Sequence, residues 1–334
     1  MDDFWRDKHV VVTGSHGLVG GFLIEHLVSA GAVVTAIDDL SRGRPDRLRH
    51  IRGIVMTARG DAAAQQALPL YRGADVVFNL AAKVTGMHYN REHHCEMFCE
   101  NMRLQMLPLL HALRAGVKRF CQVSTVCVYP HDMPYPVPED WGHRGEPEPT
   151  NAGYGWAKRM GERLAQWAAH EYGLEVAIVR PSNMYGPWDY FDEATSHVIP
   201  ALIRRAVESR EDHLLVYGSG QQIREFLYAD DGAVGMMKVT ERYAAADPVN
   251  IGTGMETAIS IADLAMLIQE VCAEMGAIRA PRALRFDTSL PDGYPRRGTD
   301  ISKLIRVTGW QPAMPLRDGL RHTIAWWLNR ERGQ

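Results

Sequence analysis

A glycine-rich segment near the N-terminus constrains the fold of this chain more than any other feature. Residues 13–20, TGSHGLVG, lie between a β-branched run at 9–13, typical of a buried strand, and an amphipathic stretch at 18–30, typical of a helix. Further strand-like runs and helical stretches alternate along the chain at 32–37, 76–80, 104–115, 120–124, 154–172 and 175–179. This alternation predicts a Rossmann-type α/β fold, a doubly wound parallel sheet covered by helices on both faces.

The three glycines of this segment have distinct roles in such a turn. Gly14 permits the tight turn, Gly17 allows a pyrophosphate to approach the backbone, and Gly20 allows the helix to pack close to the sheet. The helix N-terminus offers free N–H groups and a positive dipole end to phosphate. The segment therefore predicts a dinucleotide site.

The end of the second predicted strand bears on which dinucleotide is bound. Asp38 follows the glycines by about 20 residues, where a carboxylate accepts hydrogen bonds from the adenosine ribose. A carboxylate disfavours a 2′-phosphate, so Asp38 favours NAD. Arg42 and Arg44 follow closely and are suited to grip that phosphate, so NADP stays open.

The pattern changes near residue 181, where proline and glycine become frequent and the strand-like runs become short. We expect an NAD(P)-binding domain over 1–180 and, over 181–334, mainly a smaller α/β lobe that binds substrate. The strands expected in this lobe are 214–217, 249–251 and 284–286, and the helices are 197–207, 229–240, 261–275 and 316–330.

Composition excludes several classes of function. The formal net charge is −3 and no basic face stands out, so we expect no nucleic-acid partner. The longest apolar runs fall well short of about 18 residues and the N-terminus lacks an apolar signal region, so we expect no membrane partner and a cytoplasmic location.

Five cysteines are expected to be free thiols. His93, His94, Cys95 and Cys99 resemble a metal cluster, but adjacent histidines on a helix point in different directions and cannot readily share one ion, so we expect no metal site.

A tyrosine and a lysine at helical spacing indicate proton and hydride chemistry. Tyr154 and Lys158 are spaced i, i+4 and so share one helix face. A nearby ammonium is expected to lower the pKa of a phenol, which can then exchange a proton with a sugar hydroxyl. Thr125 follows a predicted strand at the edge of the sheet where ligands bind, and its hydroxyl can hold the substrate oxygen.

Several motifs together resemble the extended short-chain dehydrogenase/reductases. These are the glycine segment, Asn79-Leu80-Ala81-Ala82, Ser124-Thr125 with Tyr129, the Tyr154/Lys158 pair, and Arg180-Pro181-Ser182-Asn183. The resemblance spans essentially the whole chain and implies a catalytic triad of Thr125, Tyr154 and Lys158. The cofactor-binding residues it implies are Gly14, Gly17, Leu18, Val19, Gly20, Asp38, Asp61, Ala81, Ala82, Lys83, Asn101, Lys158 and Pro181.

Within that family the chain is most similar to the GDP-fucose synthases and, less closely, to the GDP-mannose 3,5-epimerases. The similarity rests on the segments 81–84, 127–130, 148–151, 196–200, 217–220, 224–226 and 291–296. It implies that Cys127 and His197 exchange protons at the carbons beside a C4 ketone. A thiol and an imidazole suit that exchange near neutral pH. The resemblance also implies a homodimer and a nucleotide-diphosphate sugar as substrate.

The arginines of the second half are candidates for the substrate diphosphate, because a guanidinium fork matches phosphate oxygens. The candidates are Arg204, Arg205, Arg224, Arg296 and Arg297, and the resemblance favours Arg205 and Arg224. Arg296 and Asn183 are also expected to bind substrate.

The chain departs from its relatives in two places. GDP-fucose synthases consume NADPH, whereas Asp38-Asp39 here resembles sites of epimerases that retain NAD and return the hydride. Val126-Cys127 replaces the Asp-Glu pair of 4,6-dehydratases, so dehydration is not expected. The leading hypothesis is a GDP-hexose 3,5-epimerase acting through a C4 ketone, with or without C4 reduction. A simple 4-epimerase or 4-ketoreductase remains open, as does a cofactor-binding regulator, which the intact triad disfavours.

Overall fold

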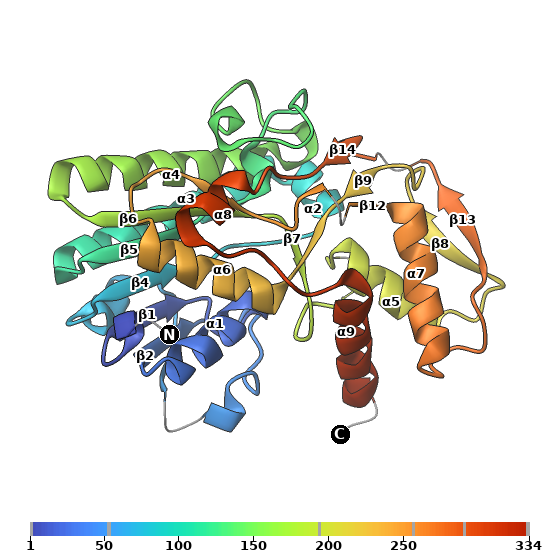
Figure 1. Ribbon diagram of the computed structural model, residues 1–334, viewed down its shortest axis with the longest axis horizontal. Helices are drawn as coiled ribbons and strands as arrows, with labels where there is room; N and C mark the ends of the chain where they lie inside the picture. The colour runs from blue at the N-terminus through green and yellow to red at the C-terminus, as the bar shows by residue number, and fades with distance from the viewer. Residues whose placement is uncertain (1–2, 52–54, 193–194, 256–257, 290–291, 332–334) are drawn as a thin grey trace.

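A computed structural model describes residues 3–51, 55–192, 195–255, 258–289 and 292–331, which form two lobes (Figure 1). Residues from both lobes line a cleft. Pro291, part of one motif noted above, lies outside these ranges. The first lobe is built on a seven-stranded sheet in the order β11-β6-β5-β4-β1-β2-β3, and every pairing is parallel. The strands are β1 (His9–Thr13), β2 (Val33–Asp38), β3 (Met56–Arg59), β4 (Val76–Asn79), β5 (Arg119–Val123), β6 (Glu175–Pro181) and β11 (Val249–Ile251).

Helices cover both faces of this sheet, as the alternation of its side chains requires. Val10 and Val12 of β1 pack on one face with α1 (Leu18–Ser29) and α6 (Ala229–Arg242). Val11 points to the other face and packs with α3 (His94–Ala115) and α4 (Ala152–Tyr172). Figure 1 shows these two layers on opposite sides of the strands. The predicted doubly wound α/β fold is confirmed.

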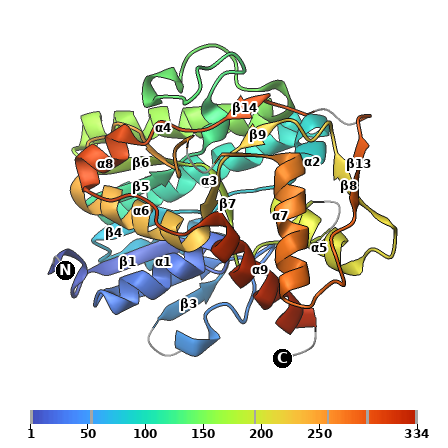
Figure 2. The same ribbon diagram turned by 45° about the vertical axis from the view of Figure 1, so that its right-hand side comes forward.

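The second lobe has a separate apolar core beneath the cleft. Helices α5 (Val198–Glu208), α7 (Ile261–Glu274) and α9 (Leu316–Glu331) pack around Leu202, Leu264, Ile268 and Ile324. Figure 2 shows α5, α7 and α9 grouped together, away from the large sheet. The remaining elements are α2 (Met87–Glu92), α8 (Ser302–Thr308), β7 (Asn183–Tyr185), β8 (His213–Tyr217), β9 (Ile223–Arg224), β10 (Phe226–Tyr228), β12 (Ile259–Ser260), β13 (Ala283–Asp287) and β14 (Arg296–Arg297).

Three segments beyond residue 180, β11, α6 and α8, return to the first lobe, although 249–251 and the helix at 229–240 were expected in the smaller one. The strand at 249–251 pairs with β6 at the edge of the large sheet. Helix α6 packs on that sheet beside α1. The expectation for 249–251 was wrong because a three-residue apolar run carries no information about its pairing partner. The domain boundary at 180 stays a prediction, with these segments crossing it.

The sequence analysis missed six strands, β3, β7, β9, β10, β12 and β14, and two helices, α2 and α8. All of these strands except β3 are only two or three residues long. The strand β3 is mostly exposed at the sheet edge, so it lacks the apolar run of a buried strand. Helices α2 and α8 are too short to show a helical period. Among the described residues, none of the helices combines the length and apolar character needed to cross a membrane.

A buried ion pair joins the sheet to α4. Arg180 of β6 donates from Nε to Glu162 Oε1 at 2.8 Å and from Nη2 to Glu162 Oε2 at 2.6 Å, and both side chains are fully buried. Burial alone would raise the pKa of Glu162, but the Arg180 charge and hydrogen bonds outweigh it and lower the pKa to about 2. Since the unfolded value is about 4.3, this carboxylate stabilises the fold above that pH. The contribution is lost as the pH falls toward 2.

We predict that Glu162→Gln lowers the free energy of unfolding by about 3–5 kcal/mol, because it leaves the Arg180 charge buried without a counter-charge. Urea denaturation measures this. The matched control is Glu171→Gln at an exposed position of the same helix, which should change stability by less than about 0.5 kcal/mol. The wild-type protein should also lose stability as the pH falls from about 4.3 to 2. The Glu162→Gln variant should lose less stability over the same pH range. Equal stability of the two variants would contradict this account.

Candidate active site

A single large cleft between the lobes collects most of the predicted site residues. Its volume of about 1380 Å³ exceeds the roughly 300–1,000 Å³ of a typical small-molecule pocket, so it has room for two ligands side by side. Residues of the first lobe that line it include Gly14, Gly17, Leu18, Val19, Gly20, Asp38, Asp61, Ala81, Ala82, Lys83, Thr125, Cys127, Tyr154 and Lys158. Residues 181–297 contribute Pro181, Asn183, His197, Arg205, Arg224 and Arg297, among others.

The turn between β1 and α1 has the shape of a dinucleotide cradle. Gly14 adopts φ 64°, and a Cβ there would lie 3.0 Å from the Ala81 backbone nitrogen. A Cβ on Gly20 would lie 2.3 Å from the Gly14 carbonyl oxygen, which allows no side chain. Gly17 precedes the first turn of α1, where free N–H groups face the cleft. These residues therefore fit a pyrophosphate.

Asp38 is held rigidly at the carboxyl end of β2. Its Oδ2 accepts from the His16 backbone N–H at 2.8 Å, and its Oδ1 accepts from the Leu40 N–H at 2.8 Å. Arg42 is directed elsewhere: it donates to the Val84 carbonyl and stacks on the Tyr190 ring at 4.2 Å. Each carboxylate oxygen keeps a lone pair for a ribose hydroxyl. This arrangement fits the NAD assignment.

One residue of the predicted cofactor set, Asn101, lies behind the cleft wall. Asn101 does not line the cleft, but it accepts from the Lys83 N–H and donates to the Lys83 carbonyl, both at 3.0 Å, which fixes the segment after β4. Asp61 lines the cleft and accepts from Arg103 at 2.6 Å. The Lys83 side chain pairs with Glu96.

Thr125, Tyr154 and Lys158 meet at the carboxyl end of β5. Lys158 donates to the Val123 carbonyl at 2.8 Å, and its Nζ lies 5.7 Å from the Tyr154 ring centroid. Burial lowers the pKa of Lys158 to about 7. Tyr154 keeps some exposure to the cleft, yet desolvation by the surrounding protein raises its pKa. In the protein alone, desolvation and then the nearby Cys127 raise this pKa, and the Lys158 ammonium is directed at Val123. The expected lowering also depended on the positive charge of a bound nicotinamide and stays a prediction.

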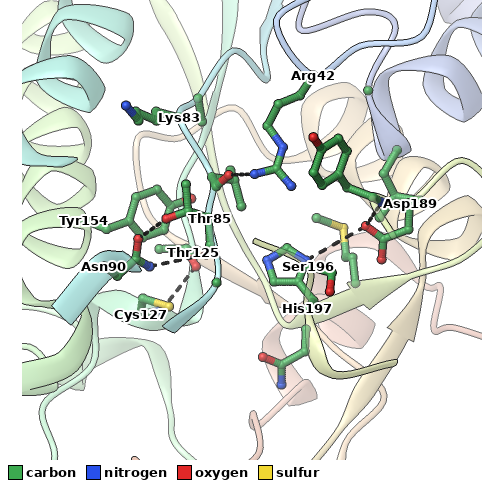
Figure 3. A pocket seen from close by; sticks show the side chains of 18 of the residues that line it. Arg42, Lys83, Thr85, Asn90, Thr125, Cys127, Tyr154, Asp189, Ser196 and His197 are labelled. Atoms are coloured by element: carbon green, nitrogen blue, oxygen red, sulfur yellow. Dashed lines mark hydrogen bonds and ion pairs between the residues drawn. The ribbon is translucent and has the colours of Figure 1, made fainter. Parts of the chain in front are cut away.

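Cys127 and His197 enter the cleft from different lobes. Cys127 follows Thr125, whose Oγ1 accepts from the Cys127 N–H at 3.2 Å, and Arg297 Nη1 lies 3.7 Å from the Cys127 Sγ. His197 precedes the first turn of α5. Figure 3 shows Thr125, Cys127 and Tyr154 on one side of the cleft and His197 on the other. A ligand between them would be contacted on two sides.

The arginines of the second half divide between the cleft and the surface. Arg224 lines the cleft beside Arg297, and burial together with that neighbouring charge lowers the pKa of Arg224 to about 9. Arg205 also lines the cleft and stacks on Tyr217 at 4.0 Å. The structure does not bring Arg296 to the cleft: it is exposed, and the next residue of β14, Arg297, faces inward instead.

Some cleft residues were not assigned to the site from the sequence. Thr85, Asn90 and Asn151 form a hydrogen-bonded chain on the Tyr154 side, with Asn90 donating to Asn151 at 2.8 Å. Asp189 lies on the His197 side. The sequence around these residues does not distinguish them, because polar residues in loops are common. Arg297 was among the candidate arginines but was not preferred. It could have been chosen because neighbouring residues of a strand point to opposite faces.

Comparison with known proteins agrees with this geometry. The model of the NAD-dependent epimerase/dehydratase family matches residues 10–252. The chain belongs to this family. It is accordingly an NAD(P)-dependent enzyme with the family's α/β fold.

Individual relatives extend over nearly the whole chain. A protein of Oryza sativa subsp. japonica named "Probable GDP-L-fucose synthase 1" is 35% identical over 97% of this chain and 94% of its own length. An epimerase of Methanothermobacter thermautotrophicus superposes with a TM-score of 0.87 at 24% identity, covering 99% of this chain and 96% of that one. A GDP-L-fucose synthetase of Naegleria fowleri bound to NADP superposes with a TM-score of 0.79 at 24% identity, covering 98% and 96%.

We predict that the protein binds NAD(H) more tightly than NADP(H). Asp38→Ala should shift the ratio of the two Kd values toward NADP by about tenfold or more, because it removes a charge that repels the 2′-phosphate. Titration calorimetry with both cofactors measures the ratio. Asp212→Ala, at an exposed position that does not line the cleft, is the control and should leave the ratio unchanged. Tighter binding of NADPH by the wild-type protein would overturn this interpretation of Asp38.

Proposed function

We propose that this enzyme is a nucleotide-sugar 3,5-epimerase that acts on a GDP-hexose whose C4 is already a ketone, and that it then reduces C4 with a hydride from NAD(P)H. The observation that carries the proposal is the approach of Cys127 and His197 from two sides of a cleft that also contains Thr125, Tyr154 and Lys158. The name of the Oryza sativa relative supports a GDP-sugar as the substrate.

The triad serves the chemistry at C4. Thr125 and Tyr154 offer hydroxyl groups to the C4 oxygen, and the bound nicotinamide supplies the hydride. Because burial raises the pKa of Tyr154, its phenol carries a proton at neutral pH and can donate it to the C4 oxygen as the hydride arrives. The product is a C4 hydroxyl, and the phenol is reprotonated from solvent.

Cys127 and His197 serve the carbons beside the ketone. The C4 carbonyl acidifies the hydrogens on C3 and C5. One of the two residues takes the proton from carbon, the electron pair moves to the C4 oxygen as an enolate, and the other residue returns a proton from the opposite face. Each inversion consumes one proton and releases one, so it needs no redox partner.

The diphosphate of the substrate requires positive charge in the cleft. Arg205 and Arg224 line it, and Arg297 is near both Arg224 and Cys127. The lowered pKa of Arg224 reflects desolvation and crowding by Arg297, which a bound anion would offset. Asn183 contacts Arg297 and supports the same region.

A simpler function, a 4-epimerase or 4-ketoreductase in which Cys127 and His197 take no part, is the competing proposal. It shares the triad and the cofactor site. The two differ in whether hydrogen at C3 or C5 exchanges with solvent, which the experiment below measures.

We predict that the wild-type enzyme, given GDP-4-keto-6-deoxymannose in D₂O, incorporates deuterium at C3, C5 or both. Cys127→Ser and His197→Gln should each lower this incorporation by about 100-fold or more while retaining hydride transfer to C4. Tyr154→Phe should show the reverse pattern. It should retain deuterium incorporation and lose hydride transfer to a similar extent, because the Tyr154 phenol donates a proton only at C4. Mass spectrometry and NADH or NADPH absorbance measure the two reactions.

Each outcome of this experiment distinguishes one proposal. Wild-type hydride transfer without any deuterium incorporation would favour the simple ketoreductase. Loss of both reactions in all three variants would indicate misfolding, which circular dichroism of the same samples reveals.

We also propose a homodimer formed through α3 and α4, in keeping with the sequence expectation. These helices expose Met106, Trp167 and Tyr172, with Trp167 54% and Tyr172 68% exposed. Light scattering should give twice the 37.4 kDa mass of one chain. Trp167→Glu should shift the mass toward that of one chain, and a wild-type monomer would contradict the proposal.

The expected cytoplasmic location stays a prediction.

A further inference from the structure

Asp189 is a buried carboxylate in the wall of the cleft, and its role is not explained by the fold. Its side chain is 5% exposed. Oδ1 accepts from the Tyr190 backbone N–H at 2.7 Å, whereas the buried Oδ2 has no hydrogen-bond partner among the described residues. A buried anion with an unused oxygen costs free energy. An asparagine of the same shape would avoid the charge, so the charge itself calls for an explanation.

The backbone before Asp189 adopts a costly conformation that orients this residue. Trp188 has φ 75°, in the left-handed region that non-glycine residues rarely adopt because it strains the backbone. Its ring packs 5.3 Å from that of Trp326 on α9 and 5.2 Å from the buried guanidinium of Arg47. Two anchors in different parts of the molecule therefore hold a strained turn that directs Asp189 into the cleft.

The groups that face Asp189 come from three segments. His197, at the start of α5, has its Nδ1 4.0 Å from Asp189 Oδ1 (Figure 3). Arg42, after β2, interacts electrostatically with Asp189 and also with Tyr190 and Asp192 of the same loop. Burial raises the pKa of Asp189, and the His197 charge, the Tyr190 N–H and Arg42 oppose that rise.

We propose that Asp189 is a positioning residue for His197: its carboxylate accepts the Nδ1–H of the imidazole and thereby directs Nε2 at the sugar ring. This inference rests on the proposed function, in which His197 exchanges a proton at carbon. A carboxylate on one ring nitrogen fixes the tautomer of a histidine and leaves the other nitrogen available for proton exchange. The proton exchanged with the sugar is taken up or released at Nε2, while Nδ1 keeps its proton and Asp189 itself is not protonated in the cycle.

The observed distance is compatible with this role. At 4.0 Å the two atoms are about 1 Å beyond a hydrogen bond. The His197 side chain is 43% exposed, so its ring has room to rotate toward the fixed carboxylate. Catalytic hydrogen bonds are often long without substrate and tighten in the complex. Oδ1, the atom nearest the ring, accepts one hydrogen bond from the Tyr190 N–H and keeps another lone pair for the Nδ1–H, so the fixed carboxylate and the movable ring complement one another.

The first test does not depend on activity. In protein labelled with ¹⁵N-histidine, two-bond proton–nitrogen correlations report the tautomer of each ring, and the His197 signals are those lost in His197→Gln. With the holoenzyme and GDP bound, we expect wild-type His197 to carry its proton on Nδ1. In Asp189→Asn this population should fall, and in Asp192→Asn, the same change at an exposed position of the same loop, it should not. A wild-type ring protonated on Nε2 would overturn the proposal, whatever the variants do.

The second test separates this proposal from the proposed function. Deuterium incorporation from D₂O into GDP-4-keto-6-deoxymannose is measured for the wild type, Asp189→Asn and Asp192→Asn. We expect Asp189→Asn to lower kcat for incorporation by at least about tenfold with little change in KM, because the acid–base group is misdirected rather than the sugar released. Asp192→Asn should match the wild type.

The outcomes are distinct. If wild-type protein incorporates no deuterium, the proposed function fails while the tautomer measurement still decides the role of Asp189. If the wild type incorporates deuterium and Asp189→Asn matches it, the positioning role is wrong. A rise in KM with kcat unchanged would assign Asp189 to substrate binding and would also overturn it.

Discussion

The buried pair of Arg180 and Glu162 is the interaction on which the geometry of the site depends. Glu162 lies one turn beyond Lys158 on α4, and Arg180 lies at the carboxyl end of β6, so their two hydrogen bonds fix the catalytic helix against the sheet. Ser124, the residue before Thr125, donates to the same carboxylate. One anion therefore sets the positions of all three triad residues relative to one another. Arg180 Nη1 also donates to the Tyr129 hydroxyl and the Glu139 carbonyl, which ties the long loop after β5 to this arrangement.

The cleft owes its form to segments that cross between the lobes. Helix α6 and β11 follow the start of the second lobe in sequence but pack in the core of the first. The second lobe is therefore attached through structure buried in the first, and not through a single linker. This explains why residues as distant in sequence as Cys127 and Arg297 meet at 3.7 Å. Such an arrangement favours a cleft with a fixed shape over two domains that move freely.

Sequence alone predicted the parts of this structure that local pattern determines. The glycine turn, the strands at 9–13 and 249–251, and the Tyr154/Lys158 pair follow from spacing within a few residues. Pairing partners and side-chain environments do not. The strand at 249–251 was assigned to the wrong lobe, and Arg296 was preferred over Arg297 although only the latter lines the cleft. Asp189 could not be found because its significance comes from burial and from a histidine whose distance no sequence pattern specifies.

The protonation of the triad bears on the direction of the proposed reaction at C4. Reduction of a ketone needs a proton donor, and burial keeps Tyr154 in the neutral form that donates. Oxidation of a hydroxyl needs the phenolate, whose negative charge would require a charged Lys158 beside it. Burial lowers the pKa of Lys158 to about 7, so near neutral pH this ammonium is only partly populated. The protein atoms alone therefore favour reduction, and the oxidative direction depends on the positive charge that an oxidised nicotinamide brings to the same site.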